Sequence, residues 1–68
     1  MIRVTKLDGN EMVLNAEWIQ SVESTPDTLI TLTSGVKILV QNTVEDVVER
    51  FKAYKRETLK IFKVEEKS

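Results

Sequence analysis

Short apolar segments separated by turn-forming residues fill the first two thirds of the chain. The segments are rich in Val, Ile, Leu and Thr, which is typical of strands, and the breaks between them contain Gly, Pro, Asp and Asn, which is typical of tight turns. The pattern predicts five strands, at residues 2–7, 11–14, 19–24, 29–33 and 36–41, with a corner at residues 15–18.

The last two predicted strands form a hairpin whose register can be tested, because residues paired across antiparallel strands share a face. A two-residue loop would pair Leu32 with Lys37 and mix core with solvent. A three-residue loop over residues 33–35 instead pairs Leu32 with Val36 and gives Gly35 the left-handed conformation of a bulged turn. We favour the three-residue loop.

This register leaves apolar side chains on both faces of the hairpin. Ile30 and Ile38 pair on one face, while Leu29 and Leu39 lie on the other. Because a single thin layer would expose the second pair, we expect the helix, a curled sheet or another subunit to cover it.

The other two turns are less well determined. A three-residue loop ending at Asn10 would place Val4 opposite Leu14, with Asn10 in the left-handed position, which Asn tolerates. Pro26 and Asp27 suit the centre of a type I turn, but the pattern alone does not determine the register around them.

From Thr43 onward the period changes to that of a helix. Thr43 and Asp46 resemble a capping box with Asp in place of Glu, and negative charge in the first turn suits the helix dipole. Apolar residues then recur at spacings of three and four, which predicts one stripe facing the sheet. The stripe comprises Val44, Val47, Val48, Phe51 and Tyr54 or Lys55.

The predicted fold is therefore α+β, a small antiparallel sheet or partly open barrel of about five short strands followed by one C-terminal amphipathic helix. A helix run to Lys63 would be about 30 Å long, more than so small a body covers. We expect one domain over residues 1–57, with residues 58–68 forming a helix extension or a flexible basic and apolar tail.

Composition narrows the function classes. The chain has 68 residues, no Cys and no His, so disulfides, thiol nucleophiles, His relays and the usual zinc ligand sets are excluded. A chain without disulfides suits a reducing cytoplasm. Ten basic residues against 11 acidic ones create no overall field for nucleic acid or an anionic bilayer. The start alternates instead of running apolar, and no stretch of about 18 apolar residues occurs, so we expect neither a signal peptide nor membrane insertion.

Several blocks, taken in order, resemble the flagellar FlbD/SwrD family. They are Ile2-Arg3-Val4-Thr5-Lys6-Leu7-Asp8-Gly9, Leu14-Asn15, Trp18-Ile19, Glu23-Ser24-Thr25-Pro26-Asp27-Thr28, Ile30-Thr31-Leu32-Thr33-Ser34-Gly35-Val36-Lys37, Val40 and the 44–54 helix. The resemblance covers residues 1–56. It implies a small cytoplasmic accessory protein for bacterial flagellar motility and swarming, near the inner face of the membrane at the flagellar base, that binds a motor or basal-body protein and catalyses nothing.

Residues with catalytic potential have ordinary structural explanations. Asp8 and Asp27 fall in turns, where Asp commonly bonds its own backbone, and the serines have no His or Cys to activate them. Gly9 and Gly35 are isolated turn glycines and form no phosphate-binding loop. We therefore expect no catalytic residue, metal or cofactor.

Protein contact is the remaining candidate activity. Trp18 is either a partner anchor or a core lid at the corner, and the basic helix residues either dock on an acidic partner or form a solvated face. The candidate partner-binding residues are Trp18, Leu29, Leu39, Tyr54, Lys55, Arg56, Leu59 and Phe62.

Two further expectations concern the partners. The two-faced hairpin and the surplus apolar helix predict a homo-oligomer. The alternative function is a small RNA-binding regulator, which we disfavour because the strands contain few basic residues and no stacking aromatics.

Overall fold

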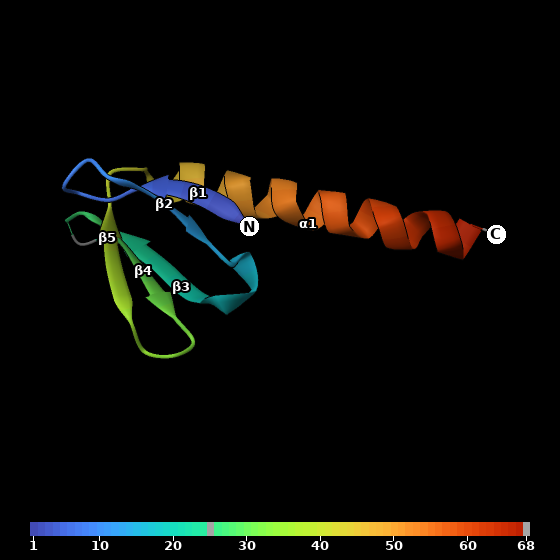
Figure 1. Ribbon diagram of the computed structural model, residues 1–68, viewed down its shortest axis with the longest axis horizontal. Helices are drawn as coiled ribbons and strands as arrows, with labels where there is room; N and C mark the ends of the chain where they lie inside the picture. Colours follow the sequence, from blue (N-terminus) through green and yellow to red (C-terminus); the bar gives the residue numbers. More distant parts are fainter. Residues whose placement is uncertain (25, 68) are drawn as a thin grey trace.

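The protein folds into five short strands and one long helix (Figure 1). This computed structural model describes residues 1–24 and 26–67, with side chains for residues 1–24 and 26–58. The elements are β1 (Ile2–Thr5), β2 (Glu11–Leu14), the 3-10 helix η1 (Ala16–Trp18), β3 (Ile19–Ser24), β4 (Thr28–Leu32), β5 (Lys37–Val40) and α1 (Val44–Lys67).

The strands form two antiparallel sheets, β1-β2 and β3-β4-β5. A single bridge between Lys6 and Val40 connects them, flanked by hydrogen bonds from Leu7 N–H to the Leu39 carbonyl (3.3 Å) and from Gln41 N–H to the Thr5 carbonyl (2.7 Å). The strands therefore follow one another in the order β2-β1-β5-β4-β3, as in a partly open barrel. The predicted α+β class is confirmed.

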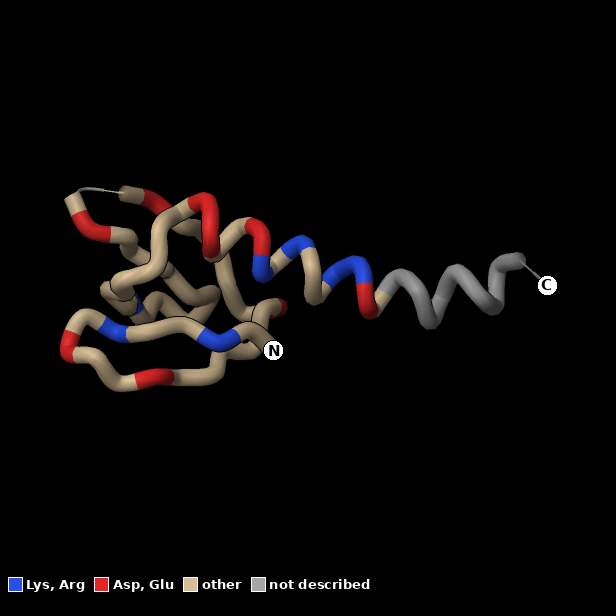
Figure 2. Tube along the Cα trace, turned by 90° about the horizontal axis from the view of Figure 1, so that it is seen from above, with Lys and Arg blue, Asp and Glu red and all other residues tan. Residues whose placement is uncertain are grey.

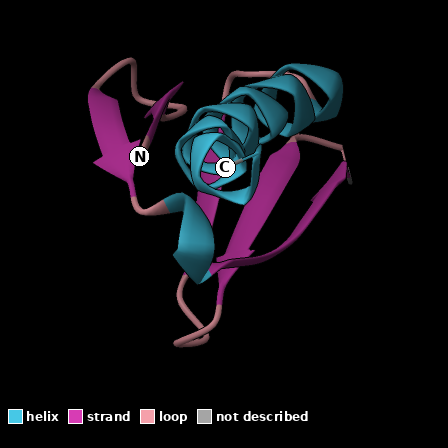
Figure 3. Ribbon diagram, turned by 90° about the vertical axis from the view of Figure 1, so that its right-hand side faces the viewer, coloured by secondary structure: helices cyan, strands magenta, loops and turns pink. Residues whose placement is uncertain are grey.

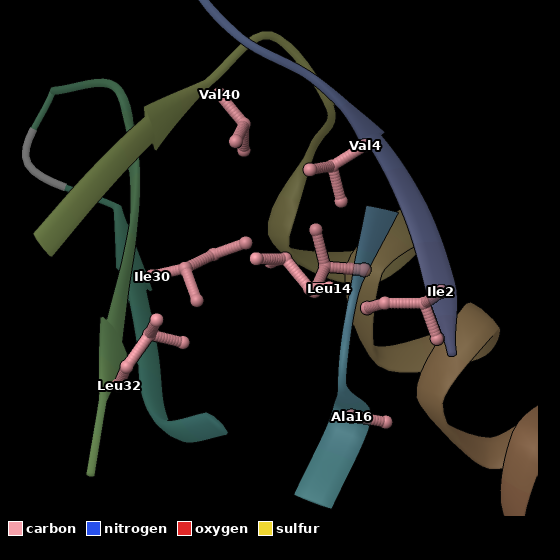
Figure 4. Packing of buried hydrophobic residues seen from close by; sticks show 8 residues of the cluster. Ile2, Val4, Leu14, Ala16, Ile30, Leu32 and Val40 are labelled. Atoms are coloured by element: carbon pink, nitrogen blue, oxygen red, sulfur yellow. The ribbon is translucent and has the colours of Figure 1, made fainter. Parts of the chain in front are cut away.

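The core lies between the β1-β2 hairpin and the inner face of the three-stranded sheet, with α1 running between the two sheets (Figure 3). Figure 4 shows side chains from the two sides pointing toward one another. Among the described side chains, the buried apolar residues are Ile2, Val4, Leu14, Ala16, Ile30, Leu32, Val40 and Val47. Eight side chains make a thin core, as expected for a chain of this length.

The predicted register of the last hairpin is confirmed. Ile30 pairs with Ile38 and Leu29 with Leu39, and Leu32 N–H donates to the Val36 carbonyl at 2.8 Å. Gly35 has a φ of +94°, the left-handed conformation that the three-residue loop requires. The inner face of this hairpin is covered by the β1-β2 hairpin and α1.

The predicted register of the first hairpin is wrong by two residues. Leu14 lies opposite Ile2, and Val4 lies opposite Met12. Gly9, at φ +94°, takes the left-handed position expected for Asn10, because glycine adopts that conformation without a Cβ clash. A shift of two residues keeps each side chain on its own face, so the predicted inward residues are still buried.

Strand ends differ slightly from the prediction. Residues 6–7, 33, 36 and 41 lie outside the strands, and β4 begins one residue earlier than expected, at Thr28. β3 and β4 pair through Ser24 and Thr28, which determines the register around Pro26. The turn itself includes residue 25, which lies outside the described residues.

α1 begins where the capping pattern predicts. The Thr43 hydroxyl accepts a hydrogen bond from Asp46 N–H at 3.0 Å, satisfying one of the free donors of the first turn. The stripe faces the core, with Val47 fully buried and Phe51 and Tyr54 packed against the cluster. Val48 departs from the prediction, since it lies at the edge of the stripe and is 37% exposed.

An amide network fastens the start of α1 to the free edge of β1. The Asn42 side chain accepts from Thr5 N–H (2.8 Å) and donates to Asp46 (3.0 Å). Arg50 then donates to Asp46 (3.1 Å) and to the Arg3 carbonyl (2.6 Å). Side chains of Asn42 and Arg50 thus form the hydrogen bonds of the β1 edge beyond the end of β5.

Candidate functional site

Several large apolar side chains are exposed on the surface of the body. Within the described part of the chain they are Met1, Leu7, Val13, Trp18, Val36, Leu39 and Val48. Four of the seven, Leu7, Trp18, Val36 and Leu39, line two adjoining hollows, so the exposure is concentrated and not scattered.

The first hollow lies between β5 and the turn that follows β1. The second lies between η1 and the β4-β5 loop, and the two share Leu32 and Val36 as lining residues. We call the combined surface the β5 groove. It is lined by Lys6, Leu7, Asp8, Met12, Trp18, Leu32, Thr33, Ser34, Val36, Lys37, Ile38 and Leu39.

The two bulged turns create this groove. Gly9 N–H bonds to the Lys6 carbonyl (2.9 Å), and Gly35 N–H bonds to the Leu32 carbonyl (2.8 Å). Leu7 lies within the first turn and Val36 directly follows the second, and they are 43% and 53% exposed. Apolar residues that continue the core pattern therefore reach the surface.

Trp18 lies at one end of the groove and is 57% exposed, so its interpretation as a core lid is wrong. The main chain around it is well held. Asn15 caps η1 by accepting from Glu17 N–H (3.0 Å), and the Trp18 carbonyl accepts from Thr33 N–H (2.7 Å). A large aromatic ring on a rigid corner is a suitable anchor for a protein partner.

The charged groups of the groove, Lys6, Asp8 and Lys37, all line its first hollow. Asn10 N–H donates to the Asp8 carboxylate (2.9 Å), and this bond, with help from Lys6, lowers the pKa of Asp8 below its usual 3.8. Lys37 makes no ion pair within the described residues. The groove is therefore mainly apolar, and the ammonium group of Lys37 has no ion-pair partner in the described part of the chain.

The helix candidates lie outside the groove and have contacts within the chain. Tyr54 is half-buried against the core. Lys55 pairs with Glu17 (2.9 Å), which lowers the Glu17 pKa, and its ammonium lies 5.6 Å from the centre of the Phe51 ring.

Arg56 is 3.5 Å from Glu49 on an exposed face, and Figure 2 shows acidic residues over the first turns of α1 with basic residues after them. Intrachain pairing of this kind favours the solvated-face interpretation of the basic helix residues.

The remaining candidates divide into two groups. Leu39 is 44% exposed in the groove, while its partner Leu29 is half-buried outside it. The side chains of Leu59 and Phe62 lie outside the described residues. Sequence reasoning missed Leu7 and Val36, and the signal that would have found them is an apolar residue inside a three-residue turn or directly after it.

Reactive groups do not gather anywhere in the described residues. No three carboxylates come close enough there to hold a metal ion, and each buried side-chain N or O atom among them has a hydrogen-bond partner. The described helices include none that is long and apolar enough to span a membrane.

Fold and groove together define a small β-rich protein with an exposed apolar groove. The sequence profile described as "FlbD: Flagellar and Swarming motility proteins" matches residues 1–59. The chain belongs to this family of flagellar and swarming motility proteins, which confirms the resemblance. No curated protein matches the chain, and no solved structure does.

Proposed function

We propose that the protein supports flagellar motility as a non-enzymatic adaptor that binds other proteins through the β5 groove. Its place of action is the cytoplasmic side of the motor or basal body. The supporting observation is the concentration of exposed Leu7, Trp18, Val36 and Leu39 in one groove of a motility-family protein.

This groove is an unfavourable surface for an isolated molecule. Each exposed apolar side chain would gain about 25 cal/mol per Å² of surface removed from water. The rigid main chain on both sides of the groove keeps the ordering cost of binding low. An aromatic anchor beside aliphatic residues is the usual composition of the centre of an interface.

A matched pair of substitutions tests this function. Val36 and Val13 are equally exposed, at 53% and 55%, but only Val36 lines the groove. An in-frame deletion is complemented with the wild-type chain, with Val36→Glu or with Val13→Glu. We expect the deletion to reduce swimming and swarming, Val13→Glu to restore them, and Val36→Glu to fail at an equal protein level.

Two results would overturn the proposal. One is unchanged motility in the deletion strain when neighbouring genes are expressed normally. The other is full complementation by Val36→Glu, since a carboxylate in the middle of the groove cannot be buried against an apolar partner without a large penalty.

A further inference from the structure

We infer that the occupant of the β5 groove is the segment of residues 59–66 from a second copy of this chain. The inference rests on the proposed function, because it names a partner for the same groove. Three observations support it: the chemistry of the groove, the sequence of the segment, and the direction in which α1 leaves the body.

The groove requires an apolar occupant with acidic residues at one end. Trp18, Leu32 and Val36 form one part of its lining, and Leu39 lies farther along it. Lys37 lies beside them without an ion-pair partner in the described part of the chain.

The sequence from residue 59 to residue 66 has this composition. Leu59, Ile61, Phe62 and Val64 are apolar, and Glu65 and Glu66 follow them directly. These apolar residues match the apolar lining of the groove in chemistry, and either carboxylate is complementary to the ammonium group of Lys37.

The segment belongs to a second copy because α1 leads away from the groove of its own chain. α1 is a single helix of 24 residues, so it is about 36 Å long, against 21 and 18 Å for the shorter dimensions of the molecule. Figure 1 shows the turn after β1 at the opposite end from the C-terminal end of α1. Reciprocal exchange of the two segments would close a twofold dimer.

Sedimentation equilibrium of the full-length chain tests the self-association. We expect the wild type and Val13→Glu to form dimers with the same dissociation constant. Val36→Glu and a chain ending at Thr58 should each weaken dimerisation at least tenfold. Lys37→Glu should weaken dimerisation about twofold to fivefold, as for an exposed ion pair. Adding Glu65→Lys and Glu66→Lys to the Lys37→Glu chain should restore the wild-type dissociation constant.

Cross-linking tests the contact itself, because the natural chain has no Cys. Two chains of different mass, one with Val36→Cys and one with Phe62→Cys, are mixed and treated with a short thiol-specific cross-linker. We expect the mixed product to form faster than with Val13→Cys in place of Val36→Cys. Circular dichroism checks that each variant folds.

Each contrary result has a distinct meaning. A monomeric wild type at tens of micromolar, or equal dimerisation by Val36→Glu and Val13→Glu, overturns this inference. If Val36→Glu still abolishes motility in that case, another protein occupies the groove and the proposed function stands. If the dimer forms as expected but the deletion strain moves normally, the proposed function is wrong and the dimer stands.

Discussion

Asn42 links the β1 edge to the first turn of α1. Its side-chain oxygen satisfies Thr5 N–H on the β1 edge, and its nitrogen bonds to Asp46 in the first turn of α1. One side-chain amide therefore forms hydrogen bonds to two elements, β1 and α1, that are far apart in sequence. A side chain lacking either a donor or an acceptor cannot replace it.

Asn42→Ala should destabilise the protein by about 1–3 kcal/mol, because it leaves the part-buried Thr5 N–H without an acceptor. Urea unfolding measures the change. Gln20→Ala is the control, since Gln20 is exposed and its side chain has no bond within the described residues. Equal unfolding midpoints for the two variants would show that the Asn42 bonds contribute nothing.

The carboxylates of Asp46 and Glu17 make the free energy of unfolding depend on pH in the acidic range. Arg50, then Asn42, hold the pKa of Asp46 below its usual 3.8, and Lys55 holds the pKa of Glu17 below its usual 4.5. A lowered folded pKa contributes stability above the usual value, and that stability is lost as pH falls through the lowered pKa.

We therefore expect the urea midpoint to fall from pH 5 toward pH 2, and to fall less in Asp46→Asn, which has no charge to lose at this position. Parallel acid dependence in the wild type and in Asp46→Asn would contradict this assignment. Both carboxylates are exposed, so the effect of each is modest.

At the scale of elements, glycine position determines the register of both hairpins. In each one, glycine is the third residue of the loop and its N–H bonds to the carbonyl three residues earlier. The correct prediction for the last hairpin used this rule with Gly35. The first hairpin was misplaced because Asn10, and not Gly9, was given the left-handed position.

Gly35→Ala should cost about 1–2 kcal/mol, because alanine is strained at a φ of +94°. A Cβ at this site would meet no atom within 4 Å, so the cost comes from the backbone alone. Gly35→Asn should cost less, since Asn tolerates this conformation. Equal thermal unfolding midpoints for Gly35→Ala and the wild type would contradict the turn assignment.

Local pattern predicted most of the fold and less of the surface. Strand segments, the Thr43 cap and the apolar stripe are encoded in residues near one another, so periodicity shows them. The Asn42 bond to Thr5 joins residues 37 positions apart, and no local pattern contains it. The exposure of Val36 was missed because it depends on whether another strand or helix packs over this turn, which no local pattern shows.

At the scale of the whole molecule, a thin core limits stability. A chain of this length has about 3–10 kcal/mol of total stability, so each buried side chain matters. Val47 is the only fully buried residue that the described side chains of α1 contribute. It therefore carries much of the attachment of the helix to the sheets.

Val47→Ala should cost about 2 kcal/mol, from the lost methyl burial and the cavity left behind. The neighbouring Val48→Ala should change stability little, because Val48 is 37% exposed. The free energy of unfolding in urea measures both. Equal losses would show that α1 does not pack through Val47 as described.

Photocrosslinking in motile cells tests whether the β5 groove contacts protein. A photoreactive residue is placed at position 36 in one strain and at the equally exposed position 13 in another. We predict covalent adducts from position 36, with a second copy of the chain among them, and few from position 13. Equal yields from the two positions, in cells that swarm normally, would contradict the claim.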